Sequence, residues 1–493
     1  MQIAVIGSGI AGMATAARLA HQGHQVAVFE ANKYPGGKVT VIEKNGYRFD
    51  AGPSLFTLPH LVDDTIAYCG RNPRDYYQYE KVPVACRYFW EDGTELTAWG
   101  DRQKFAREAE KILGEPADKT LRYLQQAADM YHTTAPLFLE KSLHKFSTFV
   151  NKEAWQALKS LHKLNLTRTL HQVNAGQRRH PKMTQLFDRF ATYNGSSPYL
   201  TPGVMSMIPH LEHNVGTFYP KGGLHAVTRA LYQLAQDVGV QFHFCRKAEK
   251  INVLNGRATG ITVQNQTLPY DLVVSNMDVM PTYRKLLSEQ PAPEKTLRQP
   301  RSSSALIFYW GIKKEFPQLD LHNIFFSDNY QQEFKEIFEH GRVFHDPTIY
   351  VNISSKRDPG DAPAGCENWF TMINVPGNTG QNWEELIAET RKNTLDKLHR
   401  ILNVKVEDYL ECEEILDPPG IEQKTQSYQG SLYGASSNNS MAAFLRHPNF
   451  SQKIKGLYFC GGSVHPGGGI PLCLLSAKIT ASLIDKNYGR NKK

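Results

Sequence analysis

The stretch VIGSGIAGMATAARLAHQGHQVAVFE, residues Val5 to Glu30, joins two apolar runs through a glycine-rich turn and a helix-like segment. Its three glycines, Gly7, Gly9 and Gly12, form the pattern G-x-G-x-x-G. In this pattern the first glycine permits a tight turn, the second lets the backbone approach a pyrophosphate, and the third lets helix and strand pack closely. The helix that follows would aim its N-terminal N–H groups at the phosphates. We therefore expect a dinucleotide site here. The alternative is an ordinary β-α-β set of packing glycines.

Glu30 ends the second apolar run, where an acidic side chain accepts hydrogen bonds from ribose hydroxyls. A 2′-phosphate would be repelled by this carboxylate, which argues against NADP. The segment YPGGKV follows and supplies a second glycine pair with a cation beside it, namely Gly36, Gly37 and Lys38. The segment YRFDAGPSLF then adds Gly52, Pro53 and Ser54. Together these motifs favour FAD over NAD.

With these motifs the N-terminal region resembles the FAD domain of the glutathione-reductase-type flavoproteins, in the branch that holds amine oxidases and carotenoid desaturases. Three later stretches resemble the same branch: GTFYPKGGLHAVTRAL (216–231), DLVVSNMD (271–278) and KGLYFCGGSVHPGGGIPLCLLSAKITASLI (455–484). The resemblance implies that Ala248 meets the adenine through its backbone. The FAD-binding residues that the motifs and the resemblance imply are Gly7, Gly9, Ile10, Ala11, Gly12, Glu30, Ala31, Gly36, Gly37, Lys38, Gly52, Pro53, Ser54, Ala248, Asn276, Gly462, Ser463, Gly469, Ile470 and Pro471.

The resemblance implies an α/β fold, in which a Rossmann-like FAD-binding domain of the glutathione-reductase/amine-oxidase type carries an inserted mixed-sheet substrate domain and a helical membrane-facing subdomain. At 493 residues the chain is long enough for two or more domains. We place the FAD-binding domain at 1–75, 216–290 and 425–493. The substrate domain takes 76–110 and 291–424, and the helical subdomain takes 111–215.

Composition excludes several other classes. No run of 18 apolar residues occurs, so we expect no membrane-spanning helix, and the N-terminus lacks the basic region of a secretory signal. The seven cysteines are scattered and form no C-x-x-C pair, which favours free thiols in a reducing cytoplasm and no metal site.

The resemblance implies carotenoid desaturation, in which hydride leaves one carbon for the flavin and a proton leaves its neighbour. Such chemistry needs alignment and an apolar tunnel more than a paired acid and base. His465, in the C-terminal glycine-rich turn, is the best candidate for the base, and the alternative is a structural histidine. The neighbours Asp188 and Arg189 are better explained as a solvated pair.

Within the family, the segments HPGGGIPLCLLSAK and GSLYGASSNNS resemble the hydroxycarotenoid 3,4-desaturases more than the phytoene desaturases. A phytoene desaturase, a carotenoid isomerase, an aldehyde-forming carotenoid oxidase or an amine oxidase are the alternatives within the branch. A further alternative is a non-catalytic lipid-escort protein with this fold, although intact glycine turns at both ends of the chain argue against it.

A carotenoid resides in the lipid bilayer, so its enzyme must take it from the membrane. The formal net charge of the chain is +8, and residues 141–190 contain ten Lys or Arg against two acidic residues, interleaved with aromatic and leucine side chains. This pattern favours an interfacial segment on anionic lipid. We expect a cytoplasmic protein that is peripheral on the inner face of the cell membrane, with a carotenoid as substrate and no nucleic-acid partner. A solvated helical face is the alternative.

Overall fold

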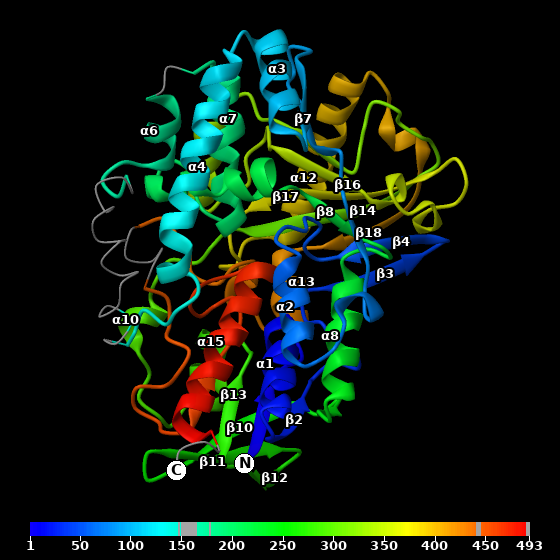
Figure 1. The fold of residues 1–493 in the computed structure, drawn as a ribbon. Coiled ribbons are helices and arrows are strands. Elements are labelled where there is room, and N and C mark those ends of the chain that lie inside the picture. The colour runs from blue at the N-terminus through cyan, green and yellow to red at the C-terminus, as the bar shows by residue number, and fades with distance from the viewer. Residues whose placement is uncertain (146–147, 149–164, 177–178, 440–444, 490–493) are drawn as a thin grey trace.

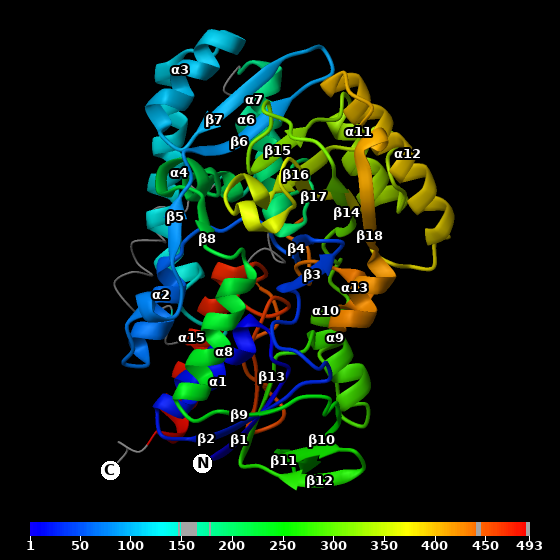
Figure 2. The same cartoon turned by 90° about the vertical axis from the view of Figure 1, so that its right-hand side faces the viewer.

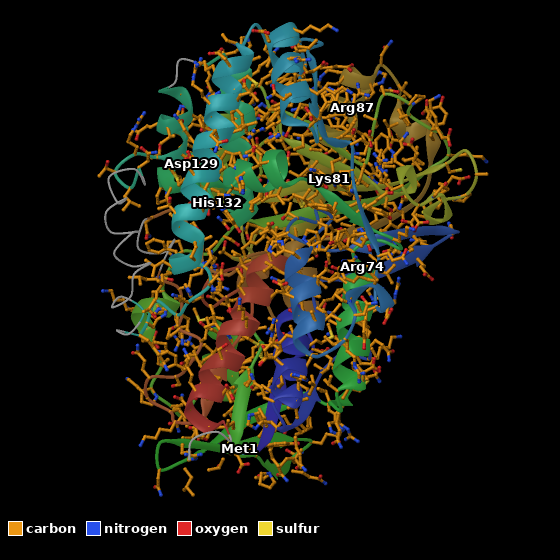
Figure 3. All side chains as sticks on the ribbon, viewed as in Figure 1. Met1, Arg74, Lys81, Arg87, Asp129 and His132 are labelled. Atoms are coloured by element: carbon orange, nitrogen blue, oxygen red, sulfur yellow. The ribbon has the colours of Figure 1, made fainter. Side chains whose placement is uncertain are left out.

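The computed structural model describes residues 1–145, 148, 165–176, 179–439 and 445–489. One half of the molecule is built on a parallel sheet and the other on a larger mixed sheet (Figure 1). Met1 and Arg87 lie at opposite ends of the molecule, one in each half (Figure 3). The α/β class predicted from the sequence is confirmed, whereas the domain boundaries stay predictions.

The parallel sheet draws its five strands from distant parts of the chain. In spatial order they are β19 (Leu457–Phe459), β13 (Leu272–Ser275), β1 (Gln2–Ile6), β2 (Gln25–Phe29) and β9 (Gln241–His243). Helices α1 (Ile10–His21), α8 (His225–Asp237) and α15 (Ile470–Tyr488) share one apolar core with this sheet. Figure 1 shows α15, from the C-terminal part of the chain, beside α1 from the N-terminal part. The other face of the sheet packs against a small antiparallel sheet of β10 (Ala248–Leu254), β11 (Arg257–Val263) and β12 (Gln266–Pro269).

The second sheet has seven strands, of which all neighbours except β15 and β6 run antiparallel. In spatial order they are β18 (Leu410–Leu416), β14 (Ser304–Ile312), β17 (Glu367–Val375), β16 (Ile349–Ile353), β15 (His322–Phe325), β6 (Val84–Phe89) and β7 (Glu95–Trp99). Helix α12 (Trp383–Leu402) covers its outer face, as Figure 2 shows. The hairpin of β3 (Thr40–Lys44) and β4 (Tyr47–Ala51) packs on the inner face. The inner face is therefore the one turned toward the parallel-sheet half.

Helices cover the far end of the seven-stranded sheet, and their apolar faces share a core with β6 and β7. They are α3 (Arg102–Leu113), α4 (Ala117–Phe138) and α7 (Pro181–Asp188), and α6 (Leu170–Ala175) packs against α7 outside this core. The remaining elements are α2 (His60–Tyr68), β5 (Tyr79–Lys81), β8 (Phe218–Pro220), α9 (Val279–Pro281), α10 (Glu294–Leu297), α11 (Tyr330–Lys335) and α13 (Pro418–Thr425). Within the described ranges, no helix has the length and apolarity needed to cross a bilayer.

Ion pairs with other segments neutralise part of the charge in the basic window 141–190. Lys152, Lys159 and Lys163, which the predicted interfacial segment includes, lie outside the described residues. Arg179, Lys182 and Arg189 form ion pairs with Glu115, Asp92 and Glu212 respectively. Part of the charge excess counted along the chain is therefore neutralised by carboxylates from outside the window, whereas the membrane-binding role stays a prediction.

Candidate functional site

The first glycine turn, residues 7–12, joins β1 to α1 and leaves no room for side chains. Gly7 has a φ of +96° and its N–H donates to the carbonyl of Phe29 at 2.8 Å. A Cβ on Gly12 would lie 2.2 Å from the carbonyl oxygen of Gly7, whereas a Cβ on Gly9 would meet Asn276 Oδ1 at 2.7 Å. Gly12 is therefore needed for packing of the helix on the turn. Gly9 keeps its outer side open to a ligand, with only one side chain against it.

The N-terminus of α1 is uncapped by protein side chains. Its N-cap is Gly9, no side chain of the described residues accepts a hydrogen bond from the first turn, and that turn holds no acidic residue. The second glycine pair lies beside it: Gly36 N–H donates to Ser8 O at 2.9 Å, and a Cβ on Gly37 would come within 3.3 Å of Gly9 Cα. Ile10 and Ala11 belong to this first turn. Open N–H groups at a helix N-terminus fit a phosphate, so the residues present fit the pyrophosphate of a dinucleotide.

Glu30 lies at the end of β2, buried beside the first glycine turn. One of its carboxylate oxygens accepts hydrogen bonds from the backbone N–H and the hydroxyl of Ser8, both at 2.8 Å, and the other accepts from Asn32 N at 2.8 Å. Its backbone carbonyl accepts from Arg246 N at 2.8 Å, which brings the segment leading to Ala248 alongside. Ala31 follows it on the surface. Glu30 thus organises the loop around the predicted ribose position.

We expect Glu30→Ala to weaken FAD binding by about 1–3 kcal/mol, because a charge-assisted hydrogen bond to the ribose and the support of the Ser8 loop are both lost. Titration of the apoprotein with FAD measures this change. The matched control is Glu43→Ala, which removes an exposed carboxylate from β3. Wild-type FAD affinity in the Glu30 variant would contradict the assignment.

Lys38 follows the second glycine pair, but its ammonium does not lie on either glycine turn. It donates to the backbone carbonyls of Ser431 and Leu432 at 2.9 and 2.8 Å. Burial lowers its pKa to about 8, although the nearby Asp278 opposes that shift. The cation predicted to lie beside the pyrophosphate therefore holds the N-terminal FAD segment against the chain that returns from the substrate half.

Gly52, Pro53 and Ser54 follow β4 and lie between the two halves. Gly52 has a φ of +151°, and a Cβ there would lie 1.8 Å from the carbonyl oxygen of Lys38. The two segments are therefore in backbone contact. Ser54 Oγ lies 2.8 Å from the hydroxyl of Tyr350 on β16. Ser54 thus joins the predicted cofactor segment to the inner face of the seven-stranded sheet.

The second glycine turn, residues 461–469, precedes α15. Gly469 is the N-cap, with a φ of +97°, and a Cβ on it would meet no atom within 4 Å. No side chain caps α15 and its first turn, which includes Ile470 and Pro471, has no acidic residue. The α1 and α15 helices thus both present open, positive N-termini, and the helices pack on each other.

Three other predicted cofactor residues make contacts within the protein. Asn276 packs over the first glycine turn and donates from Nδ2 to Cys460 O at 3.1 Å. Ser463 Oγ accepts from Val279 N at 3.1 Å, and Gly462 approaches Gly468 closely. These contacts hold the two glycine turns next to each other.

His465 is buried in the second glycine turn. Its Nε2 lies 2.8 Å from the carbonyl of Lys141, and its ring packs edge-on against His144 at 5.9 Å between centroids. Burial lowers the pKa of His465 to about 4, so the ring is neutral at physiological pH. Nε2 must then carry the proton that it donates to the carbonyl, which leaves Nδ1 as the basic nitrogen.

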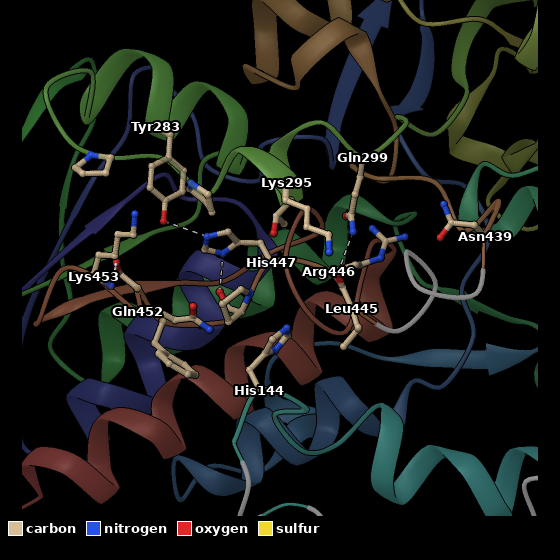
Figure 4. Close-up of a pocket in the computed structure, with 16 residues that line it drawn as sticks. His144, Tyr283, Lys295, Gln299, Asn439, Leu445, Arg446, His447, Gln452 and Lys453 are labelled. Carbon is tan, nitrogen blue, oxygen red and sulfur yellow. Dashed lines mark hydrogen bonds between the residues drawn. The ribbon is translucent and has the colours of Figure 1, made fainter.

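A cavity of about 660 Å³ lies on the outer side of Arg446 and is lined by residues of 283–299 and 439–453 together with His144 (Figure 4). Arg446 donates through Nη1 to the carbonyls of Tyr433 and Gly462, at 2.7 and 3.3 Å. Burial lowers the pKa of Arg446 to about 10. In Figure 4, His447 bonds to Tyr283 OH and to the carbonyl of Pro448. The cavity lies beside the second glycine turn, and none of the predicted cofactor residues lines it.

Several side chains on the inner face of the seven-stranded sheet are partly accessible. Tyr350, Met372 and Asn374 are only half-buried although β16 and β17 are interior strands of the sheet. Tyr350 and Met372 are directly opposite each other in the register. Ser54, Leu432 and Cys473 are half-buried as well. Side chains that stay accessible on interior strands can contact another molecule, so this face is the candidate substrate surface.

Asp188 and Arg189 form no solvated pair. Asp188 is 1% exposed and accepts from Asn174 at 2.8 Å, with His171 Nδ1 at 2.6 Å, beside a cavity of about 580 Å³. Arg189 is buried and bonds to Glu212 and to the hydroxyl of Tyr88. The interpretation as a surface salt bridge was wrong, because each partner comes from another segment of the chain.

The comparisons with known proteins agree with this geometry. The family model described as "Flavin containing amine oxidoreductase" matches residues 10–485. A 1-hydroxycarotenoid 3,4-desaturase from Flavobacterium sp. (strain P99-3) is 56% identical over 97% of this chain and 98% of its own length. A 4,4′-diapolycopene oxygenase from Methylomonas sp. is 33% identical over 98% of both chains. A 4,4′-diaponeurosporene oxygenase from Staphylococcus aureus (strain MSSA476) is 30% identical over 100% of this chain and 99% of its own.

Solved structures support the same fold. An oxidoreductase from Methanosarcina mazei superimposes with a TM-score of 0.62 at 18% identity, covering 99% of this chain and 100% of that one. Putrescine oxidase bound to putrescine superimposes with a TM-score of 0.64 at 13% identity, covering 99% of each chain. At such identities the likeness concerns the fold alone.

Proposed function

This chain belongs to the family of flavin-containing amine oxidoreductases, and we propose that it is an FAD-dependent carotenoid desaturase that forms the 3,4 double bond of a 1-hydroxycarotenoid. Its cofactor is FAD. The observation that carries the proposal is the 56% identity to the Flavobacterium desaturase over almost the whole of both chains. The two open helix N-termini and the half-buried inner face of the sheet supply what such an enzyme needs: a pyrophosphate site and room for a long apolar substrate.

Different segments of the chain would hold different parts of the FAD molecule. The first glycine turn, the second glycine pair and Glu30 would hold the adenosine diphosphate part of FAD, and the second glycine turn would hold the remainder. When bound, FAD supplies the acceptor for the hydride that leaves the substrate. The positive end of α15 stabilises negative charge that develops near it. The inner sheet face aligns the polyene and keeps water out.

The direct test is anaerobic mixing of the FAD-loaded protein with a 1-hydroxylated acyclic carotenoid in detergent. We expect the absorbance of oxidised flavin to bleach while the carotenoid loses two hydrogens and its absorption moves to longer wavelength. A product with an added oxygen, formed only in air, would instead support the activity in the names of the Methylomonas and Staphylococcus relatives. An unbleached flavin would contradict the proposal.

We propose His465 as the group that takes the proton. A carbon next to a delocalised cation is so acidic that a base with a pKa of about 4 suffices, and this base stays unprotonated throughout the physiological range.

We expect His465→Gln, which retains an N–H donor for Lys141 O but lacks a basic nitrogen, to slow flavin reduction by at least about 100-fold. In the wild type this rate should not change between pH 6 and 9. The matched control is His399→Gln on the exposed side of α12. A wild-type rate of flavin reduction in the His465 variant would show that this histidine has only a structural role.

We propose further that the chain binds the inner face of the cell membrane through the window 141–190, without the paired Arg179, Lys182 and Arg189. The support comes from sequence: basic residues in this window alternate with aromatic and leucine side chains. The triple substitution of Lys152, Lys159 and Lys163 by Glu is expected to abolish flotation with anionic liposomes while the flavin spectrum is unchanged. High salt should release the wild type, since charges are screened over about 10 Å at 0.1 M. Exchanging the exposed Lys335, Lys392 and Lys405 for Glu makes the same charge change elsewhere and should leave flotation intact.

A further inference from the structure

A short chain of polar side chains crosses from the cofactor segment to the inner face of the seven-stranded sheet. Ser54 Oγ lies 2.8 Å from Tyr350 OH, which in turn lies 2.7 Å from His322 Nδ1. His322 and its neighbour Asn352 are buried, whereas Ser54 and Tyr350 are half-buried at the candidate substrate surface. The chain therefore has a buried end and an end that a ligand can reach.

The side-chain amide of Asn352 indicates the direction of the hydrogens in this chain. The amide nitrogen of Asn352 donates to Leu321 O at 2.9 Å, which orients the amide, and it lies 3.2 Å from His322 Nδ1. A donor next to Nδ1 requires Nδ1 to be an unprotonated acceptor. Burial lowers the pKa of His322 to about 4, so the ring is neutral and its proton resides on Nε2. Among the described residues Nε2 has no hydrogen-bond partner, so the contact of Nδ1 with the Asn352 amide is what assigns the tautomer.

It follows that Tyr350 donates its hydrogen to His322 Nδ1. Burial raises the pKa of Tyr350 above its ordinary value, so the phenol keeps that hydrogen. The phenol oxygen can then only accept, and Ser54 donates to it. Both hydroxyl hydrogens therefore point toward His322. The oxygen lone pairs that remain at the accessible end of the chain can only accept a hydrogen bond from a donor. A hydroxyl of the substrate supplies one; a hydrocarbon, an ether or a carbonyl group does not.

The pair also lies next to the segment that the sequence assigns to the cofactor. Ser54 lies two residues after Gly52, and Gly52 is in backbone contact with Lys38. In a 1-hydroxycarotenoid that becomes desaturated at carbons 3 and 4, one carbon separates the hydroxyl-bearing carbon from the new double bond. The group that binds the hydroxyl must therefore lie near the cofactor and not at a distant end of the substrate surface.

We propose that Ser54 and Tyr350, polarised by His322 and Asn352, accept a hydrogen bond from the substrate's hydroxyl and thereby select hydroxylated carotenoids. This inference rests on the proposed function, of which it identifies the specificity-determining residues. Tyr309 offers a matched comparison, because it occupies the same sheet face, is fully buried, and has a hydroxyl without a hydrogen-bond partner in the described structure.

The test uses the FAD-loaded full chain and three acyclic carotenoids with the same polyene, carrying hydroxyl, methoxy or hydrogen at carbon 1. Flavin reduction under anaerobic conditions gives kcat/KM for each. We expect the wild type to prefer the hydroxyl compound by about 100-fold or more over both others, since a site built to bind a hydroxyl rejects analogues that lack the donor. Tyr350→Phe, and independently Ser54→Ala, should reduce this preference to a few-fold. Tyr309→Phe should retain it.

The outcomes separate the inference from the function on which it rests. If Tyr350→Phe and Ser54→Ala slow all three substrates equally, or keep the preference, the inference is overturned while the desaturase function stands. If the wild type has the same kcat/KM for the methoxy compound as for the hydroxyl compound, the assigned direction of the hydrogen bonds from Ser54 to His322 is wrong. If none of the three bleaches the wild-type flavin, the proposed function fails and the inference fails with it. Bound FAD per protein, measured by absorbance for every variant, shows that each one has folded.

Discussion

Replacing Gly9 with valine is expected to give a colourless protein that binds FAD at least about 100-fold more weakly than the wild type. The side chain would occupy the space in front of the α1 N-terminus and press on Asn276 Oδ1, only 2.7 Å from the position of the new Cβ. Overpacking alone costs about 1–3 kcal/mol, and tenfold in affinity corresponds to about 1.4 kcal/mol. Because bound cofactor stabilises the folded state by mass action, the melting temperature should no longer rise when FAD is added.

Gly9 is a better target for this experiment than Gly12. A Cβ on Gly12 meets the backbone carbonyl of Gly7, so a substitution there disrupts the fold whatever the ligand. A Cβ on Gly9 meets a side chain only. Gly360→Val is the matched control, since Gly360 is exposed, has an ordinary φ and has only Asp358 Oδ1 near its Cβ position, at 3.7 Å. A yellow, active Gly9→Val protein would exclude this turn as the pyrophosphate site.

Arg189→Met is expected to lower the free energy of unfolding by about 3–5 kcal/mol, because it leaves the Glu212 carboxylate buried without its counter-charge. The two side chains are 9% and 1% exposed and 2.9 Å apart. Burial acts to raise the pKa of Glu212, but Arg189, with help from His213 and Tyr193, outweighs it and holds that pKa below its ordinary value. Arg189 also stacks on the ring of Phe190, with 4.4 Å between the guanidinium carbon and the ring centroid.

The pH dependence of stability should change sign in this variant. In the wild type the lowered pKa of Glu212 contributes stability above its unfolded-state pKa, and this is lost as the pH falls through the folded-state value. Without Arg189, burial raises the folded-state pKa, so acidification from pH 7 should stabilise Arg189→Met relative to the wild type. Denaturant unfolding at pH 7 and 5 measures the effect in the variant, and unfolding at pH 5 and 3 measures the loss in the wild type.

Two further variants complete the measurement. Arg189→Met combined with Glu212→Met should recover much of the lost stability, because no unpaired charge remains. Arg122→Met breaks an exposed pair with Asp118, whose side chains are 66% and 64% exposed, and should cost no more than about 0.5 kcal/mol. Equal losses for Arg189→Met and Arg122→Met would contradict the assigned role of the buried pair.

The local geometry of the predicted cofactor site follows from the sequence because its residues are close together in the chain. Gly7, Gly9 and Gly12 act within one turn, and Glu30 follows at the end of the next strand, so spacing alone indicates their geometry. The second glycine pair and the glycines before α15 are local in the same sense. The α/β class, the FAD cofactor and the desaturase family follow from these turns together with the resemblance of the segments around them.

What the tertiary structure decided involves contacts between distant segments. Lys38 donates hydrogen bonds to two carbonyls that are 393 and 394 residues away in the chain. Ser54 and Tyr350 are hydrogen-bonded across 296 residues, and Arg189 bonds to Glu212 in another turn. Neither the spacing nor the charge of a window predicts such pairs, since any of many polar residues could have been the partner, and only the packing of the two halves selects one. For the same reason a count of ten basic residues in one window overstated its free charge. The sequence by itself determined which cofactor this protein binds; the folded chain decided which side chains face the substrate, because that surface forms only where the two halves meet.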